Sequence, residues 1–436
     1  MKSSSRYAAF SILLSMEQEN AYSNIQLDRA LSAFTGERRD KAFISLLVNG
    51  VCERRLTLDF QIRTHLTQKS RIKPAVRVLL RLGIYEILFC DGIPPRASVN
   101  EYVELAKNTA ARHATGLINA ILRRTAENGL LLPPEAHADY LSVRYSFPSE
   151  TVALLKSIYG ENTERFLASS LEKPKIYGRV NTNKTDLPFL QDALQQEGLE
   201  IMPCENLPDS FYFLSTAAFM QTRAFRNGLF HIQDLSSQLC CKALQLEADN
   251  SLLDVCAAPG GKAFTAAEIL QNTGSVLACD IHEHKIKLMT DGAKRLGLAN
   301  FSARLRDASV FDTNGGLFDR ILCDVPCSGL GVIRKKPEIK YRPLSGNAGL
   351  PELQLAILET SARYLKPGGR LVYSTCTVTK EENEDVVLHF LQKHPEFSPA
   401  ETGINGIGCK SDCGLRLSPF ADDCDGFFIA PLIRRS

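Results

Sequence analysis

The sequence predicts a multidomain protein in which an all-α domain, a small α+β connector and an α/β domain follow one another. The chain has 436 residues, and a single domain usually holds about 100–200. Apolar residues recur at spacings of three and four up to about residue 126, which is typical of helices. From about residue 230 short apolar runs alternate with amphipathic stretches, which is typical of a mostly parallel sheet with crossover helices. We expect the three domains at 1–135, 136–228 and 229–436.

Helical spacing justifies the first domain. It appears in three groups of apolar residues: Phe43, Leu46, Leu47 and Val51, then Val76, Leu79, Leu80 and Ile84, then Leu117, Ile118, Ile121 and Leu122. A short apolar run at 8–16 follows Lys2 and Arg6, as in a signal peptide. Glu17 and Glu19 come after the run without a small-residue cleavage pattern, so we predict an amphipathic first helix instead.

Charge is distributed unevenly along the chain. Residues 1–130 contain 19 Lys and Arg against 12 Asp and Glu, a net of +7, whereas the rest contain 32 against 37, a net of −5. The first domain is therefore a candidate surface for a polyanion. A helical domain with solvated Lys and Arg faces explains the same numbers, and charge alone does not decide between the two.

The overall composition excludes several protein classes. Hydrophobic residues make up 44% and charged residues 23%, which excludes intrinsic disorder and fibrous proteins. No uninterrupted apolar stretch reaches the roughly 20 residues that span a bilayer. The 13 cysteines are odd in number and lack the dense spacing of a secreted disulfide scaffold, so we expect reduced thiols in a cytoplasmic protein.

Mixed patterns predict the elements of the connector and of the last domain. Pro133 and Pro134 mark a linker, and the connector is expected to contain a helix at 151–159 and strands near 177–180 and 211–214. In the last domain we expect strands at 252–256, 276–280, 301–305, 320–325 and 370–375, and helices at 262–270, 284–296 and 352–365. Pro367 is expected to end the last of these helices, and Thr379 with Glu382 to form the capping box of one more.

A turn of small residues follows the first strand of the last domain. It runs Asp254-Val255-Cys256-Ala257-Ala258-Pro259-Gly260-Gly261-Lys262 and leads into a helix. At the carboxyl end of a parallel strand, such a turn lets a ligand approach the backbone closely. The phosphate-binding Walker pattern does not fit, because Cys256 stands where Gly is required and Ala263 where Ser or Thr is required. An ordinary strand-to-helix turn remains the alternative.

Acidic residues and cysteines stand at the ends of the other strands. Asp280 ends the second strand, Asp307 follows the third and Asp324 ends the fourth. Three carboxylates at one sheet edge suggest a nucleoside-containing cofactor, whose ribose hydroxyls an acidic residue can bind, although any one alone is more often a helix cap. Cys327 and Cys376 end the central strands, where a thiol can become a nucleophilic thiolate, although most cysteines are simply buried.

A nucleoside cofactor, an acid and a thiolate in one cleft suit the methylation of cytosine. Carbon 5 of cytosine is a poor nucleophile, but a thiolate that adds to carbon 6 turns the ring into an enamine that attacks an electrophilic methyl group. An acid at nitrogen 3 stabilises the adduct, and removal of the carbon 5 proton then expels the thiol. The spacing of Cys409, Cys413 and Cys424 does not match a zinc site, so we expect no metal.

Three motifs of the last domain resemble those of RNA cytosine-5 methyltransferases that use S-adenosyl-L-methionine: AAPGGK at 257–262, DVPCSGLG at 324–331 and STCT at 374–377. The first domain resembles a NusB-like RNA-binding module in segments 6–27, 77–85, 98–101 and 116–124, and the stretch 179–181 resembles the small α+β domain of the same enzymes. The combination resembles bacterial 16S ribosomal RNA methyltransferases of the RsmB/Sun/Fmu type. It implies a Rossmann-like methyltransferase domain, 16S ribosomal RNA as the partner and cytosine 967 of that RNA as the target.

The resemblance also implies roles for individual residues. Asp280 is expected at the ribose of the cofactor, Asp307 at its adenine, and Asp324 beside the transferred methyl group and the base. Cys376 is expected to be the nucleophile and Cys327 to assist product release. The methionine end of the cofactor is expected against Cys256, Ala257, Ala258, Pro259, Gly260, Gly261 and Lys262. The residues alone leave the two cysteine roles open, because DNA cytosine methyltransferases place their nucleophile after a proline, as Cys327 is placed here.

A basic segment with one aromatic residue follows Cys327. Its candidate RNA contacts are Lys335, Lys336, Lys340, Tyr341 and Arg342, since cations hold phosphates and an aromatic ring stacks on an extruded base. A bare charge run is more often a solvated face. Tyr341 stands where the family commonly has Trp, and Cys424 where it commonly has His. Two further functions remain open, namely a cytosine-5 methyltransferase with a different rRNA or tRNA target and a non-catalytic RNA-binding assembly factor.

Overall fold

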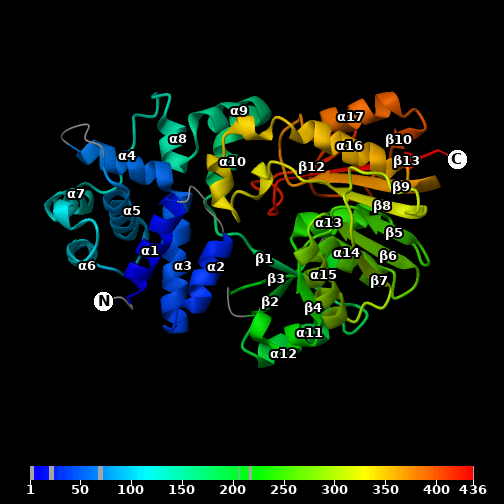
Figure 1. The fold of residues 1–436 in the computed structure, drawn as a ribbon, viewed down its shortest axis with the longest axis horizontal. Coiled ribbons are helices and arrows are strands. Elements are labelled where there is room, and N and C mark those ends of the chain that lie inside the picture. Colours follow the sequence, from blue (N-terminus) through cyan, green and yellow to red (C-terminus); the bar gives the residue numbers. More distant parts are fainter. Residues whose placement is uncertain (1–3, 19–23, 67–71, 206, 216–218, 436) are drawn as a thin grey trace. The chain divides into compact units, whose positions relative to one another are not determined.

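The computed structural model describes residues 4–18, 24–66, 72–205, 207–215 and 219–435. The chain forms two compact units, of which one is Met1–Leu171 with Lys336–Arg342 and the other is Glu172–Lys335 with Pro343–Ser436. The first unit is built of helices, and the second contains two sheets (Figure 1). Among the residues that the structure describes, no helix is long and apolar enough to cross a membrane.

The helical character predicted for the first domain is confirmed. Pro74 and Pro95 begin α5 and α6, where the missing amide hydrogen of proline costs no helical hydrogen bond. The helices of this unit are α1 (Ser5–Gln18), α2 (Asn24–Ala33), α3 (Arg38–Glu53), α4 (Arg55–His65), α5 (Pro74–Phe89), α6 (Pro95–Lys107), α7 (Thr115–Asn128), α8 (Tyr140–Tyr145), α9 (Ser149–Tyr159) and α10 (Thr163–Ser169). The last three lie within the segment expected to be the connector, but by their contacts they belong to the helical unit.

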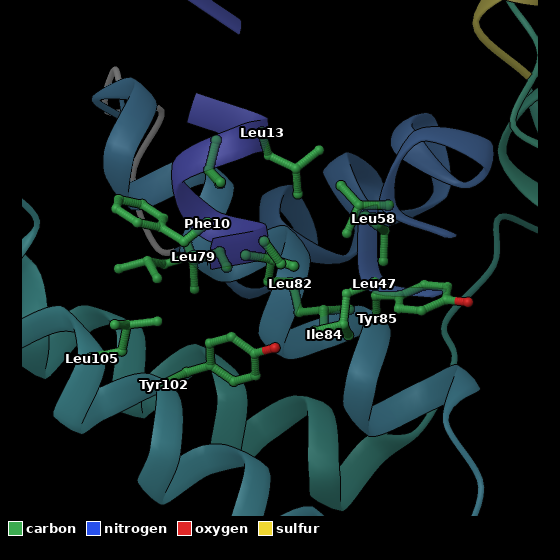
Figure 2. Close-up of a cluster of buried hydrophobic side chains, with 14 of the residues drawn as sticks. Phe10, Leu13, Leu47, Leu58, Leu79, Leu82, Ile84, Tyr85, Tyr102 and Leu105 are labelled. Atoms are coloured by element: carbon green, nitrogen blue, oxygen red, sulfur yellow. The ribbon is translucent and has the colours of Figure 1, made fainter. Parts of the chain in front are cut away.

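Helix α5 forms the centre of the helical core. Figure 2 shows its residues Leu79, Leu82 and Ile84 among apolar side chains of the neighbouring helices. On the same helix Glu86 is fully buried, and its carboxylate accepts hydrogen bonds from Arg6 at 2.8 Å, Ser98 at 2.7 Å and Tyr102 at 3.0 Å. The buried charge is thus paired and hydrogen-bonded, which burial of a carboxylate requires.

The smaller sheet of the second unit has four strands in the order β2-β3-β1-β4, and all the recorded pairings are antiparallel. The strands are β1 (Ile176–Val180), β2 (Ile201–Cys204), β3 (Leu207–Phe213) and β4 (Phe230–Ile232), and the helices beside them are α11 (Leu187–Gln196) and α12 (Arg223–Arg226). The aromatic rings of Phe211, Phe213 and Phe230 fill its core with edge-on and tilted contacts. The α+β character of the connector is confirmed.

The larger sheet has nine strands in the order β11-β12-β13-β9-β8-β5-β6-β7, with β10 paired to β13. Pairings among β5 to β9 are parallel, and β13 adds antiparallel to β9. The strands are β5 (Ser251–Asp254), β6 (Ser275–Asp280), β7 (Phe301–Leu305), β8 (Phe318–Asp324), β9 (Leu365–Thr375), β10 (Phe397–Pro399), β11 (Cys409–Ser411), β12 (Gly414–Leu417) and β13 (Phe427–Arg434). Strand order reverses between β5 and β8, which makes this the switch point where α/β sheets bind ligands.

Helices cover both faces of the larger sheet (Figure 1). One face packs on α13 (Leu235–Ala243), α14 (Gly261–Ile269) and α15 (Glu283–Leu296), through residues such as Leu239, Ala266 and Met289. The other packs on α16 (Leu350–Ala362) and α17 (Glu384–Lys393), through residues such as Leu358 and Phe390. The predicted α/β domain is confirmed.

Two local predictions in this domain are wrong. The helix expected at 352–365 ends at Ala362, and β9 already begins at Leu365 and runs through Pro367 and both following glycines. Leu365 is fully buried and pairs with Phe318 of β8, whereas the next pair is Arg370 with Arg320, so the strand register shifts across Pro367 and the two glycines. The expected capping box also fails, because α17 begins at Glu384, and the Thr379 hydroxyl donates to the Glu382 carboxylate before the helix starts.

Candidate active site

The carboxyl ends of β5, β6, β8 and β9 bring most of the predicted site residues to one edge of the sheet. Cys256 follows β5, Asp280 ends β6, Asp324 ends β8 and Cys376 follows β9. Cys327 comes three residues after β8. Side chains that lie far apart in the sequence are therefore neighbours at the switch point of the strand order.

In the turn after β5, Gly260 stands at a position where no side chain would fit. This residue has a φ of +110°, and a Cβ placed there would lie 2.5 Å from the ring of Phe264. Such a backbone conformation is available to glycine without strain. The turn is fastened to β6 because the amide of Ala257 donates to the carbonyl of Cys279 at 2.8 Å. A ligand at this edge would therefore meet backbone at close range.

Lys262 and Asp324 form an ion pair at the same edge. Lys262 Nζ lies 2.6 Å from Asp324 Oδ2, and the Ser374 hydroxyl donates to Asp324 Oδ1 at 2.8 Å. Burial is the largest single effect on Lys262 and lowers its pKa, but the charge and hydrogen bond of Asp324, together with Cys240 and Cys241, outweigh burial and hold the pKa above its usual value. Lys262 is therefore a fixed cation, and Asp324 is oriented from two sides.

The two cysteines predicted to do chemistry are in contact. Cys327 Sγ and Cys376 Sγ lie 3.2 Å apart, and both side chains are partly buried. Gly331, in the loop after Cys327, donates its amide to the carbonyl of Cys376 at 3.0 Å, and a Cβ on Gly331 would lie 1.9 Å from the carbonyl of Gly426. Close backbone packing thus holds the two cysteine turns together.

The protonation states of the two thiols are linked. The contact with Cys376 is the largest cause that raises the pKa of Cys327 well above its usual value, followed by burial and by the charges of Glu382 and Asp324. Two adjacent groups of this kind do not both ionise readily. The surroundings of Cys327 therefore favour its protonated form.

The two remaining cofactor candidates lie on local turns. Asp280 is buried, accepts from the amide of His282 at 3.0 Å and lies 3.5 Å from Lys285 Nζ. Asp307 is exposed and accepts from the amide and the hydroxyl of Ser309. Asp280 lies beside the β5 turn, since β6 pairs with β5, whereas Asp307 lies beyond β7 on the same side of the switch point.

Of the five candidate RNA contacts, Lys336 and Arg342 are exposed. Lys335 pairs with Asp234 and, at 2.7 Å, with Asp425. Lys340 is 1% exposed and donates to the carbonyl of Tyr145, and burial lowers its pKa to about 7. A phosphate contact at Lys340 does not fit this burial, because the ammonium group has no access to solvent.

Tyr341 is also held inside the helical unit. Its hydroxyl donates to the carbonyl of Glu53 at 3.0 Å, bonds the Ser146 hydroxyl at 2.8 Å and accepts from the amide of Arg55 at 3.2 Å. The Arg55 guanidinium lies 3.9 Å from the ring centroid. The face that was expected to stack on an RNA base thus contacts an arginine of the protein itself.

Two buried carboxyl groups near the site were missed from the sequence. Asp254 ends β5 and is 1% exposed, and burial together with the neighbouring Asp324 raises its pKa to about 8. Glu382 is 3% exposed and was assigned only to a helix cap. For Asp254 a signal was available, because it ends a buried strand at the same edge as Asp280 and Asp324. For Glu382 there was none.

Comparison with protein families matches three successive parts of the chain. The family described as 16S rRNA methyltransferase RsmB/F matches residues 241–433, the NusB family matches 3–127, and an RsmF/B-like ferredoxin-like domain matches 147–218. These matches agree with the helical, α+β and α/β architecture.

Whole-chain relatives and solved structures give the same picture. The chain is 36% identical over its full length to the probable ribosomal RNA small subunit methyltransferase B of Bacillus subtilis, of which it covers 99%, and 32% identical to that of Synechocystis, with 98% of this chain and 99% of the relative covered. The crystal structure of PH0851 has a TM-score of 0.79 at 25% identity, with 97% of both chains covered. NSun6 from Pyrococcus horikoshii with SFG has a TM-score of 0.62 at 25% identity, with 67% of this chain and 99% of that chain covered. The chain belongs to the RsmB/F family of 16S rRNA methyltransferases.

Proposed function

We propose that this enzyme transfers a methyl group from S-adenosyl-L-methionine to carbon 5 of a cytosine in 16S ribosomal RNA, with Cys376 as the covalent nucleophile. The observation that carries the proposal is the contact of Cys376 with Cys327, whose sulfur atoms are 3.2 Å apart, at the sheet edge that also holds the Lys262–Asp324 pair. Family resemblance favours cytosine 967 as the target. The experiment described below would also detect methylation of a different rRNA or tRNA cytosine.

The residues at the switch point fit S-adenosyl-L-methionine. The turn from Cys256 through Ala257, Ala258, Pro259, Gly260 and Gly261 to Lys262 is backbone-lined and closely fastened to β6, as the methionine end requires. Asp280 would hold the ribose hydroxyls, Asp307 would lie at the adenine and Asp324 would lie beside the methyl group and the base. This assignment is supported by the positions of Asp280 and Asp324 at the ends of β6 and β8. The cofactor would supply the electrophilic methyl group, and the chain's own residues would manage the base.

The cysteines would act in sequence. The Cys376 thiolate forms a bond to carbon 6 of the base, and its electron pair makes carbon 5 nucleophilic. Bonding of Cys376 removes the charge that raises the pKa of Cys327. Carbon 5 would then take the methyl group that the cofactor supplies, and the cofactor would be left as a neutral thioether. Cys327 then ionises more easily and, as a thiolate, can take the carbon 5 proton. The electron pair of that bond re-forms the ring double bond, the bond from carbon 6 to Cys376 breaks and the methylated base is released. Asp324, held in place by Lys262 and the Ser374 hydroxyl, would face the base during these steps.

The helical unit would supply RNA affinity. It contains a groove of about 650 Å³, lined among others by Arg55, Phe60, Arg63 and His137. Cations with an interleaved aromatic ring suit a nucleic-acid backbone. The segment 336–342, which follows Cys327 in the sequence, belongs to this unit by its contacts. Its exposed residues Lys336 and Arg342 add positive charge. In this proposal the domain at 1–135 recruits RNA and the domain at 229–436 carries out catalysis. The connector at 136–228 links the two.

The test combines labelled S-adenosyl-L-methionine with naked small-subunit RNA, followed by mapping of the modified base. We expect one 5-methylcytosine, no covalent RNA capture by Cys376→Ala, and a stalled protein–RNA adduct on a denaturing gel with Cys327→Ala. The reverse pattern would exchange the roles of the two cysteines. Absence of any methylated cytosine would overturn the proposed function.

A further inference from the structure

Glu382 lies in the turn between β9 and α17, where its carboxylate is 3% exposed. The Glu382 carboxylate accepts hydrogen bonds from several residues. Its oxygens accept from the amide and hydroxyl of Ser328 at 2.8 and 2.5 Å, from the Thr379 hydroxyl at 2.9 Å and from the Gln354 amide of α16 at 3.0 Å. The peptide oxygen of Glu382 accepts from the Tyr373 hydroxyl at 2.6 Å, which fixes the backbone as well.

Two residues that bond to Glu382 directly follow the two cysteines in the sequence. Ser328 directly follows Cys327, and Thr377 directly follows Cys376. The Thr377 hydroxyl lies 3.4 Å from Glu382 Oε1 and 2.6 Å from the Ser328 hydroxyl. One side chain therefore joins the turn after β8 to the turn after β9.

We propose that Glu382 is a positioning residue that holds Cys327 and Cys376 in contact. Without it Ser328 would lose two hydrogen bonds, and the turns of Cys327 and Cys376 would keep only the Ser328–Thr377 hydroxyl bond and the bond from the Gly331 amide to the Cys376 carbonyl. Glu382 also contributes, after Cys376 and burial, to the raised pKa of Cys327. The catalytic meaning of this role rests on the proposed function, in which the two thiols act one after the other.

The contact of the thiols can be measured without RNA. Diamide oxidises two adjacent thiols to a disulfide, and it takes up the two protons and two electrons itself to become the hydrazine. The rate at which Cys327 and Cys376 become linked, followed by peptide mass spectrometry of the full chain, reports how often the sulfur atoms meet. We expect Glu382→Ala to slow this rate roughly tenfold, because small misplacements of reacting groups have large effects on rates.

Three further variants distinguish a loss of cysteine positioning from a general loss of folding. Glu381 is the preceding residue and is exposed, so Glu381→Ala is the matched control and should link at the wild-type rate. Glu382→Gln keeps one acceptor oxygen, and the hydroxyls of Ser328, Thr377 and Thr379 can turn round to accept from its amide. This variant should therefore restore linking to near the wild-type rate. Ser328→Ala keeps the amide bond to Glu382 and should show an intermediate rate, which provides a test even if Glu382→Ala does not fold.

A second readout uses RNA. If Glu382→Ala loosens Cys327 while Cys376 still attacks, covalent protein–RNA adduct should accumulate on a denaturing gel relative to Glu381→Ala. Equal disulfide rates for Glu382→Ala and Glu381→Ala would overturn the positioning role, as would a Glu382→Gln variant as slow as Glu382→Ala. Because disulfide formation needs no substrate, this result stands even if no RNA cytosine is methylated.

Discussion

Cys327 and Cys376 have the same side chain, are both partly buried and touch each other, and the proposed function gives them different chemistry. Cys376, burial, Glu382 and Asp324 all raise the pKa of Cys327, which favours its protonated form. A reactive thiol beside a protonated one can form a covalent bond first and receive help with proton transfer afterwards.

The linkage between the thiols predicts the reactivity of Cys327. In Cys376→Ser the main cause of the raised pKa is removed, so the pKa of Cys327 should fall toward the usual value of a thiol. Each unit of that fall gives about ten times more thiolate at a fixed pH well below the pKa. We expect alkylation of Cys327 by iodoacetamide at pH 8 to be several-fold faster than in the wild type, measured by peptide mass spectrometry. Exposed Cys409 serves as the internal control, and an unchanged rate at Cys327 would contradict the linkage.

For single residues, the sequence predicts their place in the fold where they belong to one continuous motif. The β5 turn, the strand-terminal carboxylates and both cysteines were named correctly as residues that share one sheet edge, because chain topology alone places strand ends together. The surroundings of Lys340 and Tyr341 could not be predicted. A cation 13 residues and a ring 14 residues past Cys327 have the same pattern whether they face RNA or, as here, fit among Glu53, Tyr145 and Ser146.

Elements of the fold were predicted where burial and local signals agree. Strand β7 was placed at the observed residues 301–305, and α15 was placed within one residue of its start. The signals disagree at β9, where Leu365 already pairs with Phe318 before Pro367 and the two glycines, and the register shifts before Arg370 pairs with Arg320. The pairing of Leu365 with Phe318 depends on residues 47 positions apart, which no local pattern records.

Helix α5 shows how one buried charge fastens several elements. Glu86 binds Arg6 of α1 and Ser98 and Tyr102 of α6, so Arg6→Ala would leave a buried carboxylate with its cationic partner removed. Breaking a buried ion pair from one side typically costs about 3 kcal/mol. We expect a loss of about that size in the free energy of unfolding, measured by urea denaturation followed by circular dichroism.

The control for this loss is an ion pair on the surface. Lys107 and Glu104 lie three residues apart on α6 with both side chains about half exposed. Exposed pairs of this kind contribute little. Lys107→Ala should therefore leave the denaturation midpoint unchanged. If both variants shift the midpoint equally, the buried network does not have the role described.

At the scale of the whole molecule, the division into units does not follow the order of the chain. Residues 336–342 follow the loop of Cys327, but by their contacts they belong to the helical unit. Ile339 and Lys340 are buried there, and Tyr341 is hydrogen-bonded to α8–α9 and α3–α4 junction residues. The helical unit is therefore completed by a segment that the catalytic part of the chain supplies.

This arrangement predicts the behaviour of a fragment at 172–436. Such a fragment lacks the partners of Ile339 and Tyr341, so their apolar surfaces would be exposed to solvent. We expect it to aggregate, measured by light scattering after size-exclusion chromatography. The same fragment with Ile339→Ser and Tyr341→Ser should remain monomeric. Equal behaviour of the two fragments would show that the segment does not depend on the helical unit.

The path of the chain also limits how this enzyme can be recombined. A graft of its helical unit onto another catalytic domain has to carry residues 1–171 and, in addition, a seven-residue insert at 336–342. An exchange at a single crossover near residue 171 would pair the helical unit of one parent with the insert of the other. Chimeras made in this way should inherit a mismatch at Tyr341, and two further crossovers around the insert would repair it.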